Sequence, residues 1–320
     1  MASIKVGVLR GGISDEHKVS LKTGESVLSN LPEKYSGHDI ILAKSGEWYF
    51  RGWPAQPERI FRSLDVIFNA LHGRYGEDGK VQQLLETFKI PYTGSGILAS
   101  ALGMNKILSR ESFARSGLKI PLGDFATDNE SSFESANRII KKIPPPWIVK
   151  PASSGSSFGV IIARDFNALI KAIGDNLGLD SRVIIEEYIP GREATCGVLE
   201  RFRGQEHYTL PIIEIIPPPD SDFFDYSAKY SGETQELCPA NFDQEIKLVI
   251  EEMARKAHIA LGCRHYSRAD FIISPKGIYI LEVNTLPGLT EHSLLPKAIK
   301  AVGSSYAELL DHLITLALNK

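Results

Sequence analysis

The 320-residue sequence has few cysteines, no long apolar run and no surplus of charge of either sign. Cys196, Cys238 and Cys263 are too few and too far apart for a disulfide framework or a zinc knuckle, so we expect buried, unreactive thiols. No apolar run approaches the roughly 18 residues of a membrane span. Lys and Arg total 36 against 39 Asp and Glu, which excludes the basic surplus of a nucleic-acid binder. These absences predict a cytoplasmic protein that binds neither nucleic acid nor membrane.

The first hundred residues alternate between short apolar runs and helical patterns. Strands are predicted at 4–9, 40–43 and 65–71, with helices at 20–31 and 80–89. Such alternation favours a parallel α/β sheet. Ligands of these sheets gather at the carboxyl ends of strands, where this chain carries GGISDEH and HGRYGEDG.

The pattern changes after Asn105 to a mixture typical of α+β units, and the length favours about two domains. We expect helices at 105–116, 165–177, 243–261 and from 304, and strands at 147–150, 157–163, 182–189, 193–200, 207–217, 268–274 and 278–284. The polar segment 218–240 has no apolar period and is too long for an ordinary connection, which predicts a lid.

One glycine motif is misleading. GSGILA at 94–99 matches a dinucleotide-binding pattern, but it follows the third strand rather than the first. Residues 114–116 are Ala-Arg-Ser, where the motif needs an acidic residue at the end of the second strand. A nicotinamide site is therefore not expected.

The segment SRADFIISPKGIYILEVNTLPG predicts a hairpin that brings polar side chains together. Side chains alternate faces along a strand, so Arg268 and Asp270 share one face, as do Glu282 and Asn284. A turn near Pro275–Lys276 places Asp270 opposite Leu281–Glu282. Oxygen ligands without His or Cys favour Mg²⁺ over zinc. The alternative is a solvated strand face with a salt bridge.

Two further segments carry chemistry. Lys150 ends an apolar strand before a Ser/Gly loop whose N–H groups suit phosphate oxygens, although the Lys precedes the glycines and this is not a Walker A loop. An ordinary flexible hairpin is the alternative.

In RVIIEEYIPGRE, Glu186, Glu187 and Glu193 follow an apolar strand, where backbone groups suit an adenine edge and carboxylates suit an amine and ribose hydroxyls. That second pattern is weak by itself.

Eight motifs in order resemble the D-alanine–D-alanine ligases of the ATP-grasp superfamily. They span essentially the whole chain and read GGISDEHKVSL, ALHGRYGEDG, IPYTGSGILASALGMNK, IVKPASSGSSFGV, DYSAKY, CPA, RADF and LEVNTLPGLTEHSLLP. The resemblance implies an ATP-grasp fold, with an N-terminal parallel α/β domain at 1–104 and two α+β subdomains at 105–190 and 191–320 that clasp ATP. It also implies ATP-dependent joining of two D-alanines through an acyl phosphate, for peptidoglycan precursors.

The resemblance further implies a role for each matching residue. Catalytic or oxyanion roles fall on Glu16, Ser156, Tyr230, Arg268 and Gly288, and substrate binding falls on His72, Ser293 and Leu294. ATP binding falls on Lys106, Lys150, Ser157, Glu186, Glu187, Ile189, Glu193 and Lys229. Two Mg²⁺ or Mn²⁺ ions would be held by Asp270, Glu282 and Asn284. The partners implied are ATP, two D-alanine molecules and a second copy of the chain in a homodimer.

Four positions depart from the commonest family pattern: Lys18, Ser153, Ser154 and Phe158. None removes a catalytic group that the resemblance names. A D-lactate or D-serine variant ligase and a catalytically silent nucleotide-binding protein are the alternatives. Tyr230 argues against the D-lactate form, and intact Arg268, Asp270, Glu282 and Asn284 argue against a silent protein.

Overall fold

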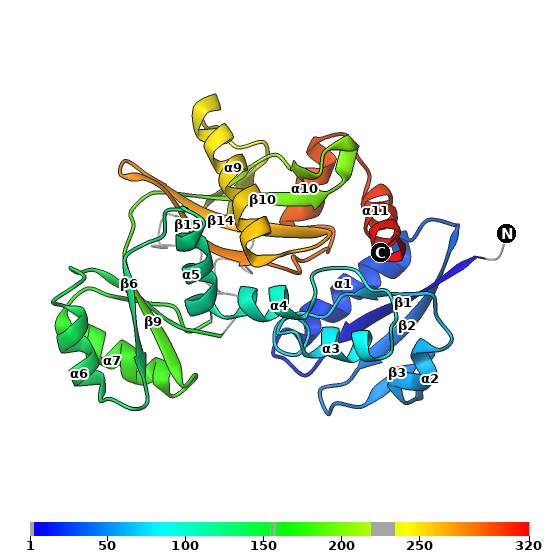
Figure 1. The fold of residues 1–320 in the computed structure, drawn as a ribbon, viewed down its shortest axis with the longest axis horizontal. Helices are drawn as coiled ribbons and strands as arrows, with labels where there is room; N and C mark the ends of the chain where they lie inside the picture. Colours follow the sequence, from blue (N-terminus) through cyan, green and yellow to red (C-terminus); the bar gives the residue numbers. More distant parts are fainter. Residues whose placement is uncertain (1–2, 154, 156–157, 219–233, 320) are drawn as a thin grey trace.

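The fold consists of three sheets with helices packed against them. The computed structural model describes residues 3–153, 155, 158–218 and 234–319. Figure 1 shows the three sheets side by side along the long axis, with both chain ends at the N-terminal sheet. The mixture of parallel α/β and α+β units confirms the predicted fold class.

The N-terminal sheet has the strand order β4-β3-β2-β1-β5, with β1 parallel to both β2 and β5. Its strands are β1 (Ile4–Gly11), β2 (Tyr35–Leu42), β3 (Trp48–Phe50), β4 (Trp53–Pro54) and β5 (Val66–Asn69), and its helices are α1 (His17–Asn30), α2 (Pro57–Phe61) and α3 (Lys80–Thr87). The parallel core agrees with the predicted alternation. The antiparallel edge strands β3 and β4 were not expected, because they are too short to show a period.

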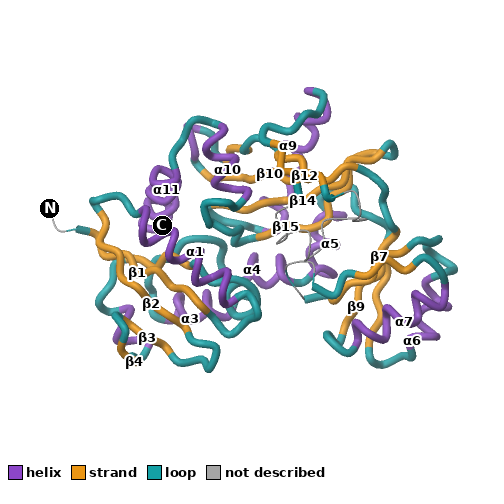
Figure 2. Tube along the Cα trace, turned by 180° about the vertical axis from the view of Figure 1, so that it is seen from behind, coloured by secondary structure: helices purple, strands orange, loops and turns teal. Residues whose placement is uncertain are grey.

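The central sheet is antiparallel, in the order β6-β9-β7-β8. It contains β6 (Gly123–Thr127), β7 (Trp147–Pro151), β8 (Ile161–Ala163) and β9 (Arg182–Glu187), with α6 (Ser132–Ile139) and α7 (Phe166–Leu177). The two helices close one face over a core that includes buried Trp147 and Ile173. Figure 2 shows α6 and α7 on the side of this lobe that is away from the other two sheets.

The C-terminal sheet runs β13-β12-β10-β14-β15, with β11 also paired to β10. Its strands are β10 (Arg192–Glu200), β11 (His207–Thr209), β12 (Ile213–Ile216), β13 (Gln235–Leu237), β14 (Tyr266–Ser274) and β15 (Gly277–Asn284). A short 3-10 helix, η1 (Phe202–Gly204), follows β10, and α9 (Gln244–Leu261) packs on β10 and β14.

Helices connect the sheets. The helices α4 (Ile97–Met104) and α5 (Lys106–Arg115) lead from the first sheet to the second, and both pack against β15 and α9. After α10 (Leu294–Ala301), the last helix, α11 (Tyr306–Leu318), returns to the N-terminal sheet. Leu309 and Leu313 of α11 share a buried core with Val6 and Val8 of β1. The two ends of the sequence therefore complete one core.

Three predicted boundaries are wrong for identifiable reasons. The strand predicted at 207–217 is two strands, because Pro211 lacks an N–H and the chain bends there between pairings with two parts of β10. The strand predicted at 157–163 begins at Ile161, after Gly159 with φ of 76°. Within the predicted lid, residues 235–237 form β13, which pairs with β12. Residues 219–233 lie outside the described residues.

No helix in the described part of the chain is long and apolar enough to cross a membrane. All three cysteines carry free thiols, as expected from their number and spacing. Cys196 and Cys263 are buried, and burial raises the pKa of the Cys263 thiol to about 12. That thiol is therefore unreactive at neutral pH.

The turn after β1 generates a stability prediction. Gly11 has φ of 94°, and a Cβ there would lie 2.4 Å from the Leu42 carbonyl oxygen. Gly46 has a similar φ of 90° but open space around it. We expect Gly11→Ala to destabilise the fold by at least about 1 kcal/mol more than Gly46→Ala, because only the former adds a clash to the backbone strain. Urea denaturation of both variants measures the difference, and equal losses would contradict it.

Candidate active site

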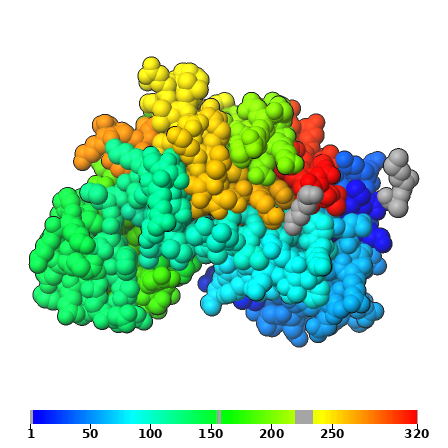
Figure 3. Space-filling view, in the orientation of Figure 1, coloured from blue at the N-terminus to red at the C-terminus, as the bar shows by residue number. Residues whose placement is uncertain are grey.

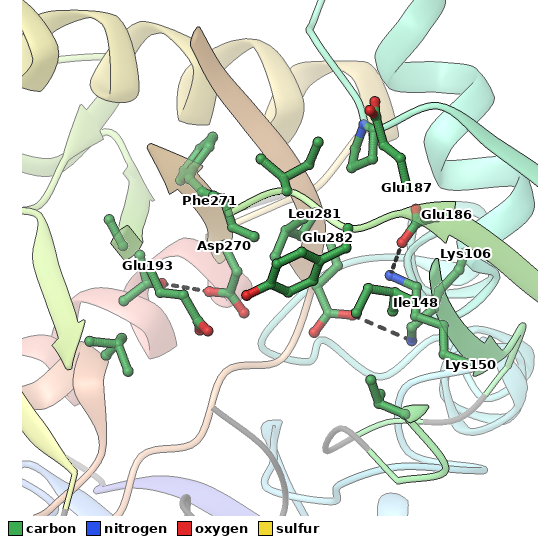
Figure 4. Close-up of a pocket in the computed structure, with 18 of the residues that line it drawn as sticks. Lys106, Ile148, Lys150, Glu186, Glu187, Glu193, Asp270, Phe271, Leu281 and Glu282 are labelled. Atoms are coloured by element: carbon green, nitrogen blue, oxygen red, sulfur yellow. Dashed lines mark hydrogen bonds and ion pairs between the residues drawn. The ribbon is translucent and has the colours of Figure 1, made fainter. Parts of the chain in front are cut away.

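A cleft lies where the central and C-terminal sheets meet (Figure 4). Figure 3 shows the surface hollowed between the lobe of the central sheet and the N-terminal lobe. Most of the ATP and metal residues that the sequence predicted line this one cleft, together with one predicted catalytic residue, Arg268, and one predicted substrate residue, Leu294. The ATP and metal residues are Lys106, Lys150, Glu186, Glu187, Ile189, Glu193, Asp270 and Glu282. Residues from 106 to 294 thus converge on a single site.

The most deeply buried charge of the cleft is the carboxylate of Glu186 on β9, whose side chain is 3% exposed. Lys150 Nζ on β7 lies 2.6 Å from its Oε2, and Arg110 of α5 donates to its Oε1 (Figure 4 shows the lysine contact). Burial alone would raise the pKa of Glu186. The cations Lys150 and Arg110 outweigh burial, so its pKa lies below the usual range.

The predicted hairpin forms with the predicted register. Asp270 of β14 lies opposite Glu282 of β15, and Arg268 lies opposite Asn284. A register shift between Asp270 and Phe271 marks an irregularity immediately beyond the acidic pair. The period-two argument from the sequence therefore placed both carboxylates on the same face of the sheet.

Each hairpin carboxylate has a basic neighbour. Arg268 donates from Nε and Nη2 to the two oxygens of Asp270, both at 2.9 Å, and Thr195 donates to Asp270 Oδ1 at 2.6 Å. Burial lowers the pKa of Arg268, but the Asp270 carboxylate outweighs it and raises that pKa above the usual range. Lys106 Nζ lies 3.4 Å from Glu282 Oε2. Arg268 and Asp270 thus form the salt bridge that the alternative interpretation named, and both residues line the cleft.

Local structure positions Lys106 at the first turn of α5. Asn105 caps the helix by accepting hydrogen bonds from the N–H groups of Ile107 and Leu108. The Lys106 N–H donates to the Ala152 carbonyl at 2.9 Å, in the loop after β7. The cap and this bond hold the Lys106 backbone next to the Ser/Gly loop that follows Lys150.

A second group lies at the carboxyl ends of the N-terminal strands. Ligand atoms of Glu16, His72 and Glu77 lie within 4.8 Å of one another. His72 Nδ1 is 3.5 Å from Glu77 Oε1, and His72 Nε2 is 2.9 Å from Thr23 Oγ1. The buried His72 is therefore held in one orientation from both sides of its ring.

Glu16 connects this group to the Ser/Gly loop. A Cβ at Gly155 would lie 2.9 Å from Glu16 Oε1, so the Glu16 carboxylate lies directly against the backbone of this loop. Asp180 holds the same loop, because Ser153 donates to Asp180 Oδ2 from N at 2.8 Å and from Oγ at 2.6 Å. Ser153, one of the four family departures, thus anchors the loop, while Phe158 lines the cleft at 53% exposure.

The third group precedes and begins α10. A Cβ at Gly288 would lie 3.1 Å from Ser293 Oγ, which accepts a hydrogen bond from the Thr290 N–H at 3.0 Å. Ser293 is the N-cap of α10 but makes no side-chain cap bond, and Pro296 lies in the first turn. The first N–H groups of a helix have no partner within the helix, and such groups suit an anion.

Some predicted residues cannot be placed: Ser154, Ser156, Ser157, Lys229 and Tyr230 lie outside the described residues. Three further residues that were not predicted from the sequence form ion pairs or hydrogen bonds with predicted site residues: Glu77, Arg110 and Thr195. Arg110 lies one helical turn after Lys106, and Thr195 two residues after Glu193, so helix and strand periods could have indicated both. Lys18 is exposed.

The pair of Arg110 and Glu186 generates a pH prediction. We expect Arg110→Met to lower the free energy of unfolding by about 1.5–3 kcal/mol at neutral pH, because a buried charged hydrogen bond is lost. The pKa of Glu186 is depressed in the folded state, so its contribution is present above the ordinary carboxyl pKa and disappears as pH falls through the folded pKa. The difference between wild type and variant should therefore shrink in acid.

Urea denaturation from about pH 7 down to about pH 2, below the ordinary carboxyl pKa, measures this difference. Arg115→Met is the matched control on the same helix, because its side chain is 83% exposed and pairs only at the surface with Glu111. The stabilising role of the Arg110–Glu186 pair would be contradicted if Arg110→Met lowered the free energy of unfolding no more than the control does. A loss that grew in acid would contradict it as well.

Comparison with known proteins agrees with this geometry. Residues 116–315 match the family described as D-ala D-ala ligase C-terminus, and residues 52–95 match the one described as D-ala D-ala ligase N-terminus. A D-alanine--D-alanine ligase of Syntrophobacter fumaroxidans is 42% identical over 317 residues, which cover 98% of both chains. One of Syntrophotalea carbinolica is 38% identical and covers 97% of this chain and 95% of its own.

Solved structures give the same answer. VanG D-Ala:D-Ser ligase from Enterococcus faecalis superposes with a TM-score of 0.86 at 32% identity, covering 99% of this chain and all of that one. D-alanine--D-alanine ligase from Bacillus anthracis complexed with ATP has a TM-score of 0.81 at 33% identity, covering 99% and 98%. The fold is therefore ATP-grasp, and the chain belongs to the D-alanine–D-alanine ligase family.

Proposed function

We infer that this enzyme joins two D-alanine molecules to D-alanyl-D-alanine, with conversion of ATP to ADP and phosphate. The observation that carries the inference is the cleft in which the lysines Lys106 and Lys150 face the carboxylates of Glu186 and Glu282. Family membership over nearly the full chain supports the same reaction. Provision of peptidoglycan precursors in the cytoplasm, by a homodimer, is part of the proposal.

ATP is proposed to lie along the cleft from β9 to the hairpin. Lys106 and Lys150 bind its phosphates, and the segment from Glu186 to Ile189 lines the adenine site. Glu193, two residues before Thr195 on the cleft face of β10, holds the ribose hydroxyls. Ser157 and Lys229 complete the phosphate contacts in this proposal.

The hairpin donors fit Mg²⁺. Asp270 and Glu282 offer carboxylate oxygens in register, and Asn284 offers an amide oxygen that also accepts the Leu286 N–H at 2.9 Å. This set contains hard oxygen ligands only, as Mg²⁺ or Mn²⁺ prefers. When bound, two such ions neutralise the phosphate oxygens and align them with the attacking carboxylate.

The two D-alanine molecules are proposed to bind on either side of the oxyanion site. Glu16, with His72 behind it, holds the ammonium group of the first D-alanine. Ser293, Leu294 and the N-terminus of α10 hold the carboxylate of the second, since free helix N–H groups favour an anion. Arg268 and the Gly288 N–H lie between these ends of the site in this proposal.

The reaction follows from charge. A carboxylate oxygen of the first D-alanine attacks the γ-phosphorus, and the bond to ADP breaks to give an acyl phosphate. Lys106 and Lys150 offset the repulsion between the two anions. The neutral amine of the second D-alanine then attacks the carbonyl carbon, and the departing phosphate takes the proton that the amine nitrogen loses. Arg268 and the Gly288 N–H stabilise the resulting oxyanion before the C–O bond breaks and phosphate leaves with the carboxylate oxygen.

Water exclusion is proposed to rest on the part of the segment 218–240 that precedes β13. An acyl phosphate hydrolyses if water reaches it, so the site must close before transfer. Ser156 and Tyr230 are proposed to join Glu16 in a hydrogen-bonded set that closes the site. These roles remain predictions of the family resemblance.

D-Serine is the second candidate for the second substrate. The likeness to a D-Ala:D-Ser ligase, with a TM-score of 0.86, favours it. The curated relatives at 37–42% identity carry the D-alanine--D-alanine name and favour dipeptide formation. The side chain that meets the second substrate decides between them.

A substrate panel tests the function. We expect ATP-dependent release of phosphate to require D-alanine and to yield D-alanyl-D-alanine, whereas L-alanine gives neither. A panel with D-serine and D-lactate beside D-alanine, analysed by mass spectrometry, identifies the second substrate. A mixed product that is mostly D-alanyl-D-serine would move the assignment to the second candidate. Phosphate release at the same rate with and without D-alanine would contradict both candidate functions.

The metal assignment yields a mutational prediction. Glu282→Gln should lower kcat by at least ~100-fold at saturating Mg²⁺, because it removes a metal-bound charge from the phosphoryl-transfer site. The fold should survive, since Glu282 is a partly exposed cleft residue whose side chain is 34% exposed. Glu58→Gln, at an exposed position of α2, is the matched control. Near-normal turnover of Glu282→Gln would contradict the assignment.

A further inference from the structure

The strand β10 has two faces with different roles. Glu193 and Thr195 face the cleft, whereas Cys196 and Val198 lie in the core beneath α9. Because side chains alternate along a strand, Glu200 continues the α9 face at the far end of β10. That end lies roughly 23 Å from Glu193, seven residues at about 3.3 Å each.

Two histidines meet Glu200 there. His207 of β11 lies directly opposite Glu200 in the antiparallel register, so both side chains share a face. His258 lies on α9 one turn after Ala254, which packs in the core against β10. Ligand atoms of the three residues lie within 4.8 Å of one another, and His258 Nε2 is 3.7 Å from Glu200 Oε1.

The inner histidine has an unsatisfied nitrogen. His258 is fully buried, and among the described residues its Nε2 makes no hydrogen bond. Its other nitrogen, Nδ1, lies 2.8 Å from Ser267 Oγ. A buried nitrogen without a partner costs stability unless something occupies the space it faces. Here that space lies between Glu200 and His207.

Hydrogen bonds from neighbouring groups fix the orientation of His258 and Glu200, as such bonds do for the ligands of known metal sites. Ser267 accepts the Nδ1–H of His258 in the tautomer that leaves Nε2 with its lone pair. The His265 N–H donates to Glu200 Oε2 at 2.6 Å, which leaves Oε1 on the side of His258. The backbone of His265 has φ of 64°, which holds that N–H at the end of β10.

We propose that Glu200, His207 and His258 form a binding site for a divalent transition-metal ion of the zinc class. Two imidazole nitrogens and one carboxylate oxygen suit Zn²⁺ and not Mg²⁺. Ligand atoms around a tetrahedral Zn²⁺ lie about 3.4 Å apart, close to the 3.7 Å between His258 and Glu200. The Glu200 side chain is 23% exposed, so the ion reaches the site from solvent and keeps a water as fourth ligand.

The position of the site indicates a structural role. Its surroundings join two lobes: the Gly94 N–H donates to His265 Nδ1 at 3.0 Å, and His312 of α11 lies 2.8 Å from the Glu200 carbonyl oxygen. An ion at Glu200 would stiffen the junction between the C-terminal sheet and the N-terminal lobe. Binding should therefore raise the thermal midpoint and leave the reaction in the distant cleft unchanged.

The experiment is a titration of metal-free protein with Zn²⁺ in excess Mg²⁺, followed by calorimetry and by thermal denaturation. We expect one Zn²⁺ site and a raised thermal midpoint in the wild type. His207→Gln should weaken binding at least tenfold and abolish the thermal shift, because it removes a ligand. His38→Gln, a half-buried histidine of the N-terminal sheet, is the matched control and should behave as wild type.

A second variant tests orientation without removing a ligand. Ser267→Ala should weaken Zn²⁺ binding by roughly 10–100-fold. Cobalt provides an independent readout, since Co²⁺ in a tetrahedral nitrogen and oxygen site gives visible absorption that His207→Gln should lose. The alternative is a plain ion pair of His258 with Glu200. The proposal would be overturned in favour of that ion pair if the wild type bound no Zn²⁺, or if His207→Gln bound Zn²⁺ as tightly as the wild type.

Discussion

The buried charge of Glu186 constrains how the two ATP-grasp sheets meet. A carboxylate that is 3% exposed needs cations close by, and it takes them from different parts of the molecule. Lys150 comes from β7 in the same sheet, whereas Arg110 comes from α5, which packs against β15 and α9 of the other sheet. The ion pairs therefore connect the central sheet to the C-terminal one at the point where the cleft opens.

Pairing of carboxylates with cationic side chains is also found farther along the cleft. Asp270 contacts Arg268 and Thr195, and Glu282 contacts Lys106, so each of the two hairpin carboxylates has a basic neighbour before any substrate binds. In the proposed reaction the incoming triphosphate supplies a stronger partner for the lysines. The hairpin carboxylates are then available to metal ions. The cleft is thus preorganised for an anionic substrate, which lowers the cost of bringing two anions together.

Short-range periods explain what the sequence could predict. The opposition of Asp270 and Glu282 followed from a short turn and a period of two, and both were readable from the hairpin alone. No short-range period indicated the approach of Glu16 to the loop at Gly155, which only the family resemblance implied, because it joins segments about 140 residues apart through packing of separate lobes. The helical spacing from Lys106 to Arg110 was visible in the sequence. Its pairing with Glu186 on β9 was not, because that contact depends on how α5 crosses between the two sheets. Likewise, nothing local indicated that α11 completes the core of β1.

In the proposed reaction, the cleft brings a carboxylate oxygen of the first D-alanine onto the γ-phosphorus of ATP. Transfer of isotope from D-alanine labelled with ¹⁸O in its carboxylate, followed by mass spectrometry of the released phosphate, tests it most directly. The acyl-phosphate route predicts one ¹⁸O atom in each phosphate released, because the C–O bond of the first D-alanine breaks in the second step. Phosphate released without label, alongside dipeptide, would contradict the account.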